Sequence, residues 1–265
     1  MLQKEAPMPT VLFEAKDGIA YITLNRPQAM NTLNTEMRPA LSDALLRFSN
    51  DDTLRVAILT GAGDRAFCAG RDLKESALTF AAGKVPYAQR PPFPSILHNT
   101  LEVWKPMIAA INGYAVGGGL EIALACDIRI AAEHAQMGLA EAKRGLYPGG
   151  GGVARLTRLV PMGVALEMLF TGDLVDAKEA HRIGLVNQVV PKAELMSAAE
   201  RMAFRIMDSA PLSLRKIKEL AYKGLDVPLP VAYRLDIGPD LAGSEDAREG
   251  AMAFVEKRKP RWKGK

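Results

Sequence analysis

The 265-residue sequence contains only two cysteines, three histidines and 6% aromatic residues. Cys68 and Cys126 cannot build a disulfide framework, and with so few histidines they leave too little material for a Cys/His metal centre. We therefore expect no metal and a reducing compartment, the cytoplasm. With 48% hydrophobic and 24% charged residues, the composition excludes a disordered or collagen-like chain and suits one large core.

A secretory signal and a membrane span are also missing. Residues 1–10 are polar and contain Pro7 and Pro9, so they lack the apolar core of a signal peptide. Residues 107–128 carry a single charge, Glu121, and have the length of a membrane span, but a glycine run at 117–119 interrupts them. We predict a buried strand, a glycine turn and a buried helix there, and no membrane association.

The net charge of +4 is unevenly distributed. Residues 256–265 hold six basic side chains against one glutamate, a local +5, so the rest of the chain sums to 4 − 5, or −1. Such a tail would suit a polyanion-binding protein that grips RNA. It is short, however, with Trp262 as its only aromatic residue, and a solvated helix end explains it equally well. We expect no nucleic-acid partner.

Short apolar runs alternate with helical patterns as far as Pro191. Residues 19–24, 56–59, 108–111 and 128–131 are typical of buried strands. A helix that Asn34 or Thr35 can cap has apolar residues at helical spacing, namely Met37, Leu41, Ala44, Leu45 and Phe48. Short apolar strands between helices predict an α/β fold in which helices cover both faces of a sheet.

Beyond Pro191 the pattern is helical, with periodic segments at 194–208 and 212–225. A last helix is predicted from Ser244 with Lys257, Arg258 and Lys259 in its final turn, where they would suit the helix dipole. We expect a body at residues 1–195 and a helical C-terminal region at residues 196–265.

Residues 79–100 contain four prolines and are too long for a simple connection. They are interpreted either as a lid over a site or as a disordered segment.

The signatures of several enzyme classes are missing. The sequence has no G-x-S-x-G elbow, no H-E-x-x-H pair and no Walker loop, and residues 61–63 lack the third glycine of a dinucleotide fingerprint. Triad hydrolysis, ATP use and hydride transfer therefore lose support.

Glycines stand instead where predicted strands meet helices. In residues 66–74, Gly70 leads into a helix that Asp72 can cap, so N–H groups around Arg71 would point outward. In residues 112–121, three glycines let the backbone approach a ligand before a helix begins. Two N–H groups converging on one oxygen would form an oxyanion hole, although tight packing is the commoner role of such glycines.

Three further side chains carry reactive groups. Glu121 falls in the first turn of an apolar helix, where it either faces a cleft or interacts with the helix dipole. Glu141 precedes a glycine-rich stretch at 145–152, and its residue type alone predicts a surface position. Cys68 has no histidine near it in sequence and is interpreted as a small buried residue rather than a nucleophile.

These motifs resemble the enoyl-CoA hydratase/isomerase (crotonase) superfamily. The matching segments follow the family's order and comprise residues 67–73, residues 109–121, Cys126-Asp127 and Thr171-Gly172. The likeness extends from Val11 to Lys263, and residues 244–264 are also similar to the carnitinyl-CoA dehydratase branch. Gln28 stands where many relatives have lysine, so a basic contact to coenzyme A is expected to be missing there.

The resemblance implies a fold, an assembly and a site. The fold would be a spiral of repeated strand-strand-helix units followed by a helical trimerisation region, assembled as a homotrimer or a dimer of trimers. The N–H groups of Arg71 and Gly118 would hold a thioester carbonyl, and Glu121 and Glu141 would be the catalytic carboxyl groups. The neighbouring residues expected to bind substrate are Ala69, Asp72, Leu73, Lys74 and Gly117.

The resemblance also implies the activity, an enoyl-CoA hydratase that adds water reversibly to a trans-2-enoyl-CoA thioester. By this resemblance Glu121 activates water and Glu141 protonates carbon 2, while the two N–H donors stabilise the enolate. Coenzyme A is part of the substrate, so no cofactor is expected. A carnitinyl-CoA dehydratase-like hydratase for a charged acyl group and an enoyl-CoA isomerase remain the alternatives.

Overall fold

The strands form two sheets in a computed structural model that describes residues 8–83 and 95–265. Their bounds are Val11–Lys16 (β1), Ile19–Leu24 (β2), Val56–Gly61 (β3), Ala66–Cys68 (β4), Met107–Ile111 (β5), Tyr114–Val116 (β6), Ile128–Ala132 (β7), Gln136–Gly138 (β8), Val175–Asp176 (β9) and Gln188–Val190 (β10). The larger sheet has the order β1-β2-β3-β5-β7-β10, and the smaller has the order β4-β6-β8-β9. Only the pairs β1·β2 and β8·β9 are antiparallel within these sheets.

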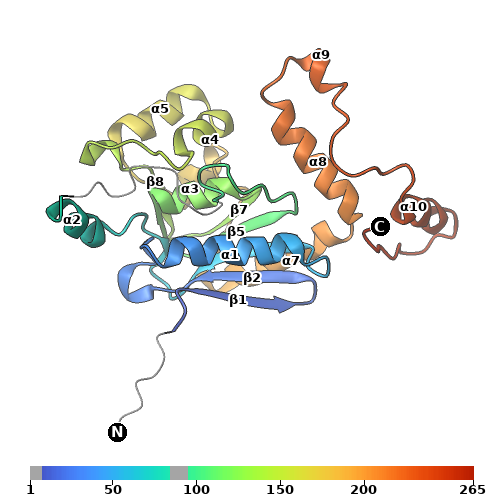
Figure 1. Cartoon of the computed structure of the whole chain (residues 1–265), viewed down its shortest axis with the longest axis horizontal. Coiled ribbons are helices and arrows are strands. Elements are labelled where there is room, and N and C mark those ends of the chain that lie inside the picture. The colour runs from blue at the N-terminus through green and yellow to red at the C-terminus, as the bar shows by residue number, and fades with distance from the viewer. Residues whose placement is uncertain (1–7, 84–94) are drawn as a thin grey trace, which may run out of the picture.

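The helices connect and cover these sheets (Figure 1). Their bounds are Met37–Asn50 (α1), Leu73–Ala81 (α2), Gly118–Ala125 (α3), Gly152–Leu159 (α4), Met162–Thr171 (α5), Ala177–Arg182 (α6), Leu195–Met207 (α7), Pro211–Gly224 (α8), Leu229–Ala232 (α9) and Glu245–Val255 (α10), with short 3₁₀ turns at Pro27–Ala29, Ala142–Arg144 and Lys192–Glu194. The sequences β3-β4-α2, β5-β6-α3 and β7-β8-α4 repeat one pattern. In each repeat the first strand joins the larger sheet and the second joins the smaller, so the chain winds as a spiral.

Helices cover both faces of the larger sheet because its strands alternate in side-chain direction. On β3, Val56 and Ile58 pack with α7, whereas Ala57 and Leu59 face the larger core that contains α1 and α3. The other parallel strands follow the same two-residue period. The helical side chains predicted at 37, 41, 44, 45 and 48 are all buried in that larger core. The predicted α/β spiral is therefore confirmed.

The smaller sheet places three loops at one edge. Its strands β4, β6 and β8 are parallel neighbours, so their carboxyl ends lie side by side. The chain leaves them at residues 69–72, at Gly117 and at residues 139–141 respectively. This edge therefore gathers the two glycine motifs and Glu141, although Gly70 and Glu141 are 141 − 70, or 71, positions apart in the sequence.

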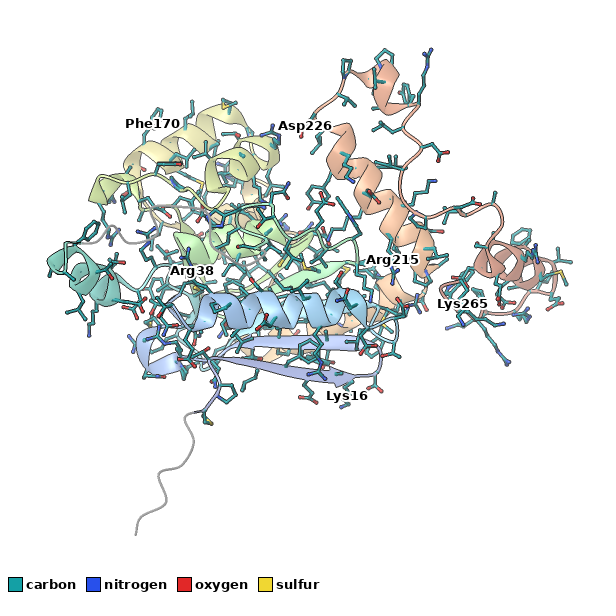
Figure 2. The ribbon with its side chains drawn as sticks, viewed as in Figure 1. Lys16, Arg38, Phe170, Arg215, Asp226 and Lys265 are labelled. Atoms are coloured by element: carbon teal, nitrogen blue, oxygen red, sulfur yellow. The ribbon has the colours of Figure 1, made fainter. Side chains whose placement is uncertain are left out.

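The C-terminal helices differ in their relation to the sheets. α7 packs against β3, β5 and β7. In contrast, α8 extends away from the layered body, and α10 lies beyond the N-terminal end of α8 (Figure 1). Figure 2 shows Arg215 near the start of α8 and Asp226 just past its end. Because α7 belongs to the packed body, the boundary between residues 195 and 196 stays a prediction.

The predicted end of the last helix is wrong. α10 ends at Val255, and Lys257 has a left-handed φ of 53° that breaks the helix. The N–H of Arg258 returns to the carbonyl of Ala253, and its guanidinium pairs with Glu249 and Glu256. Residues 257–259 therefore lie beyond the last turn of α10, and Arg258 folds back to pair with that helix.

Two other sequence-based expectations concern residues 79–100 and the apolar stretch at 107–128. The first falls partly on residues 84–94, which lie outside the described residues, while Ile96, Leu97 and Leu101 are buried. The second folds as β5, β6 and α3, as the glycine turn predicted. Among the described residues, every helix is too short or too polar to cross a bilayer.

Candidate active site

The loop after β4 is held in an extended conformation by a short pairing with Leu33. The N–H of Leu33 donates to the carbonyl of Gly70 at 2.7 Å, and the N–H of Asp72 donates to the carbonyl of Leu33 at 3.0 Å. Since N–H groups alternate in direction along an extended chain, the N–H of Arg71 points away from Leu33. Gly70 has a φ of +84°, which favours glycine at this bend.

Asp72 fixes the same loop from its side chain. It accepts hydrogen bonds from the N–H groups of Lys74 and Glu75, which makes it the predicted cap of α2. Its other oxygen pairs with Arg26 at 3.0 Å. Although burial opposes the effect, the N–H of Glu75 and the Arg26 guanidinium lower the pKa of Asp72. Both oxygens are thus engaged, so Asp72 supports the loop rather than presenting its carboxylate to a ligand.

The loop after β6 lies directly against the first. Gly117 has a φ of +56° and donates its N–H to the carbonyl of Gly138 at 2.9 Å. A methyl group built on Gly70 would lie 3.2 Å from the nitrogen of Gly118, and one built on Gly119 would overlap the carbonyl of Cys68. The glycines therefore let two strand-to-helix turns touch. The nitrogen of Gly118 opens α3, where N–H groups have no partner within the helix.

Glu121 lies in the first turn of α3 and is only 5% exposed, so the structure has the inward-facing one of the two sequence-based alternatives. Its Oε1 accepts the N–H of Gly152, at the start of α4, at 2.9 Å. Burial raises the pKa of Glu121, while the N–H groups of Gly152 and Gly150 and the charges of Arg155 and Arg38 oppose that rise. The donors thus favour the ionised form of this carboxyl, although burial outweighs them and leaves its pKa raised.

Glu141 follows β8 and is half-buried, so the surface position predicted from its residue type is wrong. A methyl group on Gly117 would lie 3.0 Å from its Oε1. Its Oε2 is buried and has no hydrogen-bond partner among the described residues. Burial, with the charge of Glu121, raises the pKa of Glu141 to about 7. Near neutral pH, Glu141 therefore keeps its proton to a greater extent than an unperturbed carboxyl does.

The two carboxyl groups stand beside consecutive residues of one turn. Glu141 lies over Gly117, and a methyl group on Gly118 would lie 3.9 Å from Oε2 of Glu121. One carboxyl accepts a backbone N–H and the other has a buried oxygen without a donor. Two carboxyl groups whose hydrogen bonds differ in this way favour different protonation states, which suits them to general base and general acid roles.

The remaining predicted residues lie around this edge. Ala69 donates its N–H to the carbonyl of Met30 at 3.0 Å, and Leu73 and Lys74 are exposed at the start of α2. Burial raises the pKa of the Cys68 thiol to about 12, which fits a packing residue. Within residues 8–83 and 95–265, the structure contains no cluster of three His, Cys, Asp or Glu side chains suited to a metal.

Sequence reasoning missed the role of the glycine turn at 150–152 and of Arg155. The glycine run itself was visible, but its function depends on α4 packing against α3. A methyl group on Gly150 would lie 2.5 Å from Oε2 of Glu121, so this turn forms the wall behind that carboxylate.

The spiral fold, with paired carboxyl groups beside two strand-to-helix turns, defines an enzyme of the crotonase class. The chain belongs to the enoyl-CoA hydratase/isomerase family, whose model it matches over residues 14–265. It is 44% identical over 259 residues to (E)-benzylidenesuccinyl-CoA hydratase of Thauera aromatica, which covers 97% of this chain and 100% of that protein. It is also 44% identical to carnitinyl-CoA dehydratase of Salmonella paratyphi A, across 93% of this chain and 95% of that protein.

The fold agrees with a solved relative. The crystal structure of enoyl-CoA hydratase from Mycobacterium tuberculosis H37Rv matches with a TM-score of 0.88 at 39% identity, covering 97% of this chain and 100% of that one. The predicted superfamily, and the likeness to carnitinyl-CoA dehydratases, are thereby confirmed.

Proposed function

We propose that this enzyme adds water reversibly to the double bond of a trans-2-enoyl-CoA and forms a 3-hydroxyacyl-CoA. The N–H groups of Arg71 and Gly118 bind the thioester oxygen, on which negative charge develops when water attacks carbon 3. Glu121 takes the proton from water as the ionised base, and Glu141 donates its proton to carbon 2. In dehydration the two carboxyl groups exchange these roles.

One observation carries this proposal: two carboxyl groups, the buried Glu121 and the half-buried Glu141, stand beside the turn at Gly117 and Gly118 and differ in their hydrogen bonds. Hydration needs one group that accepts a proton and one that gives a proton. The backbone N–H on Glu121 favours its ionised form as the base, and the pKa of Glu141, raised to about 7, lets that carboxyl carry a proton up to neutral pH.

The test uses crotonyl-CoA in ¹⁸O-labelled water with no added cofactor. We expect 3-hydroxybutyryl-CoA that carries the label, and loss of turnover in both Glu121→Gln and Glu141→Gln. The exposed Glu133 provides the control, since Glu133→Gln should leave the rate unchanged. Turnover retained in both active-site variants would reject the mechanism. An alkene that moves without taking up label would identify an isomerase instead.

The relatives suggest a second candidate substrate class. Their names describe a benzylidenesuccinyl-CoA hydratase and a carnitinyl-CoA dehydratase, and both are 44% identical to this chain. A panel of crotonyl-CoA, crotonobetainyl-CoA and (E)-benzylidenesuccinyl-CoA, compared by kcat/KM, separates a general hydratase from one specialised for a polar acyl group. A preference of 100-fold or more, about 2.8 kcal/mol, for a polar substrate would establish specialisation.

We further propose a homotrimer or a dimer of trimers. The projecting C-terminal helices expose large apolar side chains, such as Ile217 at 62% and Phe254 at 86%. The mass in solution, measured by light scattering, tests this. A monomer at micromolar concentration would refute it.

A further inference from the structure

Arg155 links three segments behind the candidate base. It lies on α4, one turn after Gly152, and its guanidinium donates to the carbonyl of Gly150 at 2.9 Å and to that of Ile96 at 2.6 Å. A methyl group on Gly151 would overlap this guanidinium, so the turn closes tightly over it. Arg155 therefore fastens the glycine turn to the segment that begins at residue 95.

The turn that Arg155 fastens is the one that holds Glu121. Gly152 donates its N–H to Oε1 of Glu121, and Gly150 lies against Oε2. Because a hydrogen bond weakens steeply with poor alignment, a small shift of the turn would release the carboxylate. The position of Glu121 thus depends on the two bonds of the Arg155 guanidinium.

The charge of Arg155 is also directed at Glu121. Both of its hydrogen bonds go to carbonyl groups, and among the described residues no carboxylate lies within ion-pair distance of it. Burial lowers the pKa of Arg155, and the charge of Glu121 is the largest influence in the opposite direction. The positive charge of Arg155 and the negative charge of Glu121 therefore attract each other across the turn, without an ion-pair contact between the two side chains.

Other groups among the described residues also act on Glu121. Arg38, at the start of α1 (Figure 2), also favours the ionised carboxylate, whereas the negative charges of Glu141 and Glu121 disfavour each other. Strands β4 and β6 pack against α3 as well, and the thiol of Cys68 on β4 is held neutral by burial. Arg155 combines a charge effect on Glu121 with hydrogen bonds that hold the turn of Gly150 and Gly152.

Resting on the hydratase function proposed above, we propose that Arg155 is a positioning residue that aims the Glu121 carboxylate and keeps it ionised, so that the proton of the pair resides on Glu141. Its guanidinium donates to backbone carbonyl groups and not to the Glu121 carboxylate itself. Its action passes through the Gly150–Gly152 turn and through its charge.

The test compares pH profiles of kcat and kcat/KM with crotonyl-CoA. In Arg155→Gln we expect kcat to fall ~10- to 100-fold with KM changed less than about twofold, since the substrate is still bound. We also expect the acid limb of kcat/KM to move up by roughly one pH unit, because the carboxylate loses a nearby cation. Arg155→Lys keeps the charge and should return the limb to its original position while kcat stays reduced.

Arg158 provides the matched control, because it lies on the same helix but is exposed and pairs with Asp226. Arg158→Gln should leave both limbs in place. Circular dichroism checks folding, and Arg155→Met replaces Arg155→Gln if the latter does not fold. An acid limb that stays in place without the charge, or that moves equally in Arg158→Gln, would overturn the inference. The proposed function fails separately, if Glu121→Gln retains turnover.

Discussion

Replacing Glu141 with glutamine should make the folded enzyme more stable at alkaline pH while it abolishes turnover. The folded protein holds this carboxyl largely away from water, with a buried oxygen that has no donor. Ionisation therefore costs free energy in the folded state but not in the unfolded chain. Glutamine has nearly the same shape and cannot ionise, so the variant avoids that cost.

The pKa of Glu141 gives the magnitude and the sign. A folded-state pKa of about 7, against an ordinary 4.5, corresponds to about 3.4 kcal/mol, which solvent screening of a half-buried group reduces to about 2 kcal/mol. Because the folded pKa is raised, the folded state binds the proton more tightly than the unfolded state. Stability from the neutral carboxyl is present below pH 4.5 and is lost as the pH rises through 7.

The assay is urea unfolding of the wild type and of Glu141→Gln at pH 5 and pH 8, at one fixed protein concentration. We expect the variant to gain about 2 kcal/mol at pH 8 and about a quarter of that at pH 5. Comparing the two pH values removes any pH-independent effect of the new amide. Glu133→Gln, at an exposed position, should show no such pH dependence. Equal differences at both pH values would refute the assignment of Glu141 as a carboxyl whose pKa is raised in the folded state.

Three further predictions concern the surroundings of this pair. Gly150→Ala places a methyl group 2.5 Å from Oε2 of Glu121 and should lower kcat ~100-fold, whereas Gly163→Ala on α5, with open space around it, should not; equal rates would contradict the wall behind the base. Asp72→Asn should lower kcat/KM roughly tenfold by weakening the ion pair with Arg26, a result checked by steady-state kinetics and contradicted by an unchanged value. The buried Cys68 thiol should resist iodoacetamide until urea unfolds the chain, and rapid labelling of the native protein, followed by mass spectrometry, would show it to be accessible.

Residue patterns alone predict the parts of this site that depend on local structure. An acid in the first turn of an otherwise apolar helix is expected either to face inward or to interact with the helix dipole, and Glu121 is buried. The cap at Asp72 and the glycine bend at Gly70 are likewise confirmed, because both depend on neighbours within a few residues. The same local reasoning identified Cys68 as buried.

The position of Glu141 depends on tertiary structure and was not visible in its neighbours. Gly138, Leu139 and Ala140 carry no periodic signal, and β8 is only three residues long. Only the pairing of β8 with β6 brings Glu141 over Gly117. The resemblance to a family supplied that position because it carries the three-dimensional arrangement that the local pattern lacks. The role of Arg155 is likewise absent from the local pattern, because its hydrogen-bond partners are backbone carbonyl groups and one of them, at Ile96, is 59 positions away in the sequence.

The smaller sheet explains why the candidate site is divided among three repeats. Its parallel strands β4, β6 and β8 are three residues long each, so they contribute few hydrogen bonds to stability. Their neighbouring positions, about 4.8 Å apart, instead set the spacing between the loop of Arg71, the start of α3 and Glu141. The register shift between Ala66 and Cys68 adds one residue to β4 just before that loop and redirects the chain into it. Because each group comes from a separate repeat, a register error in any one strand would separate the N–H donors from the acids while leaving the larger sheet intact.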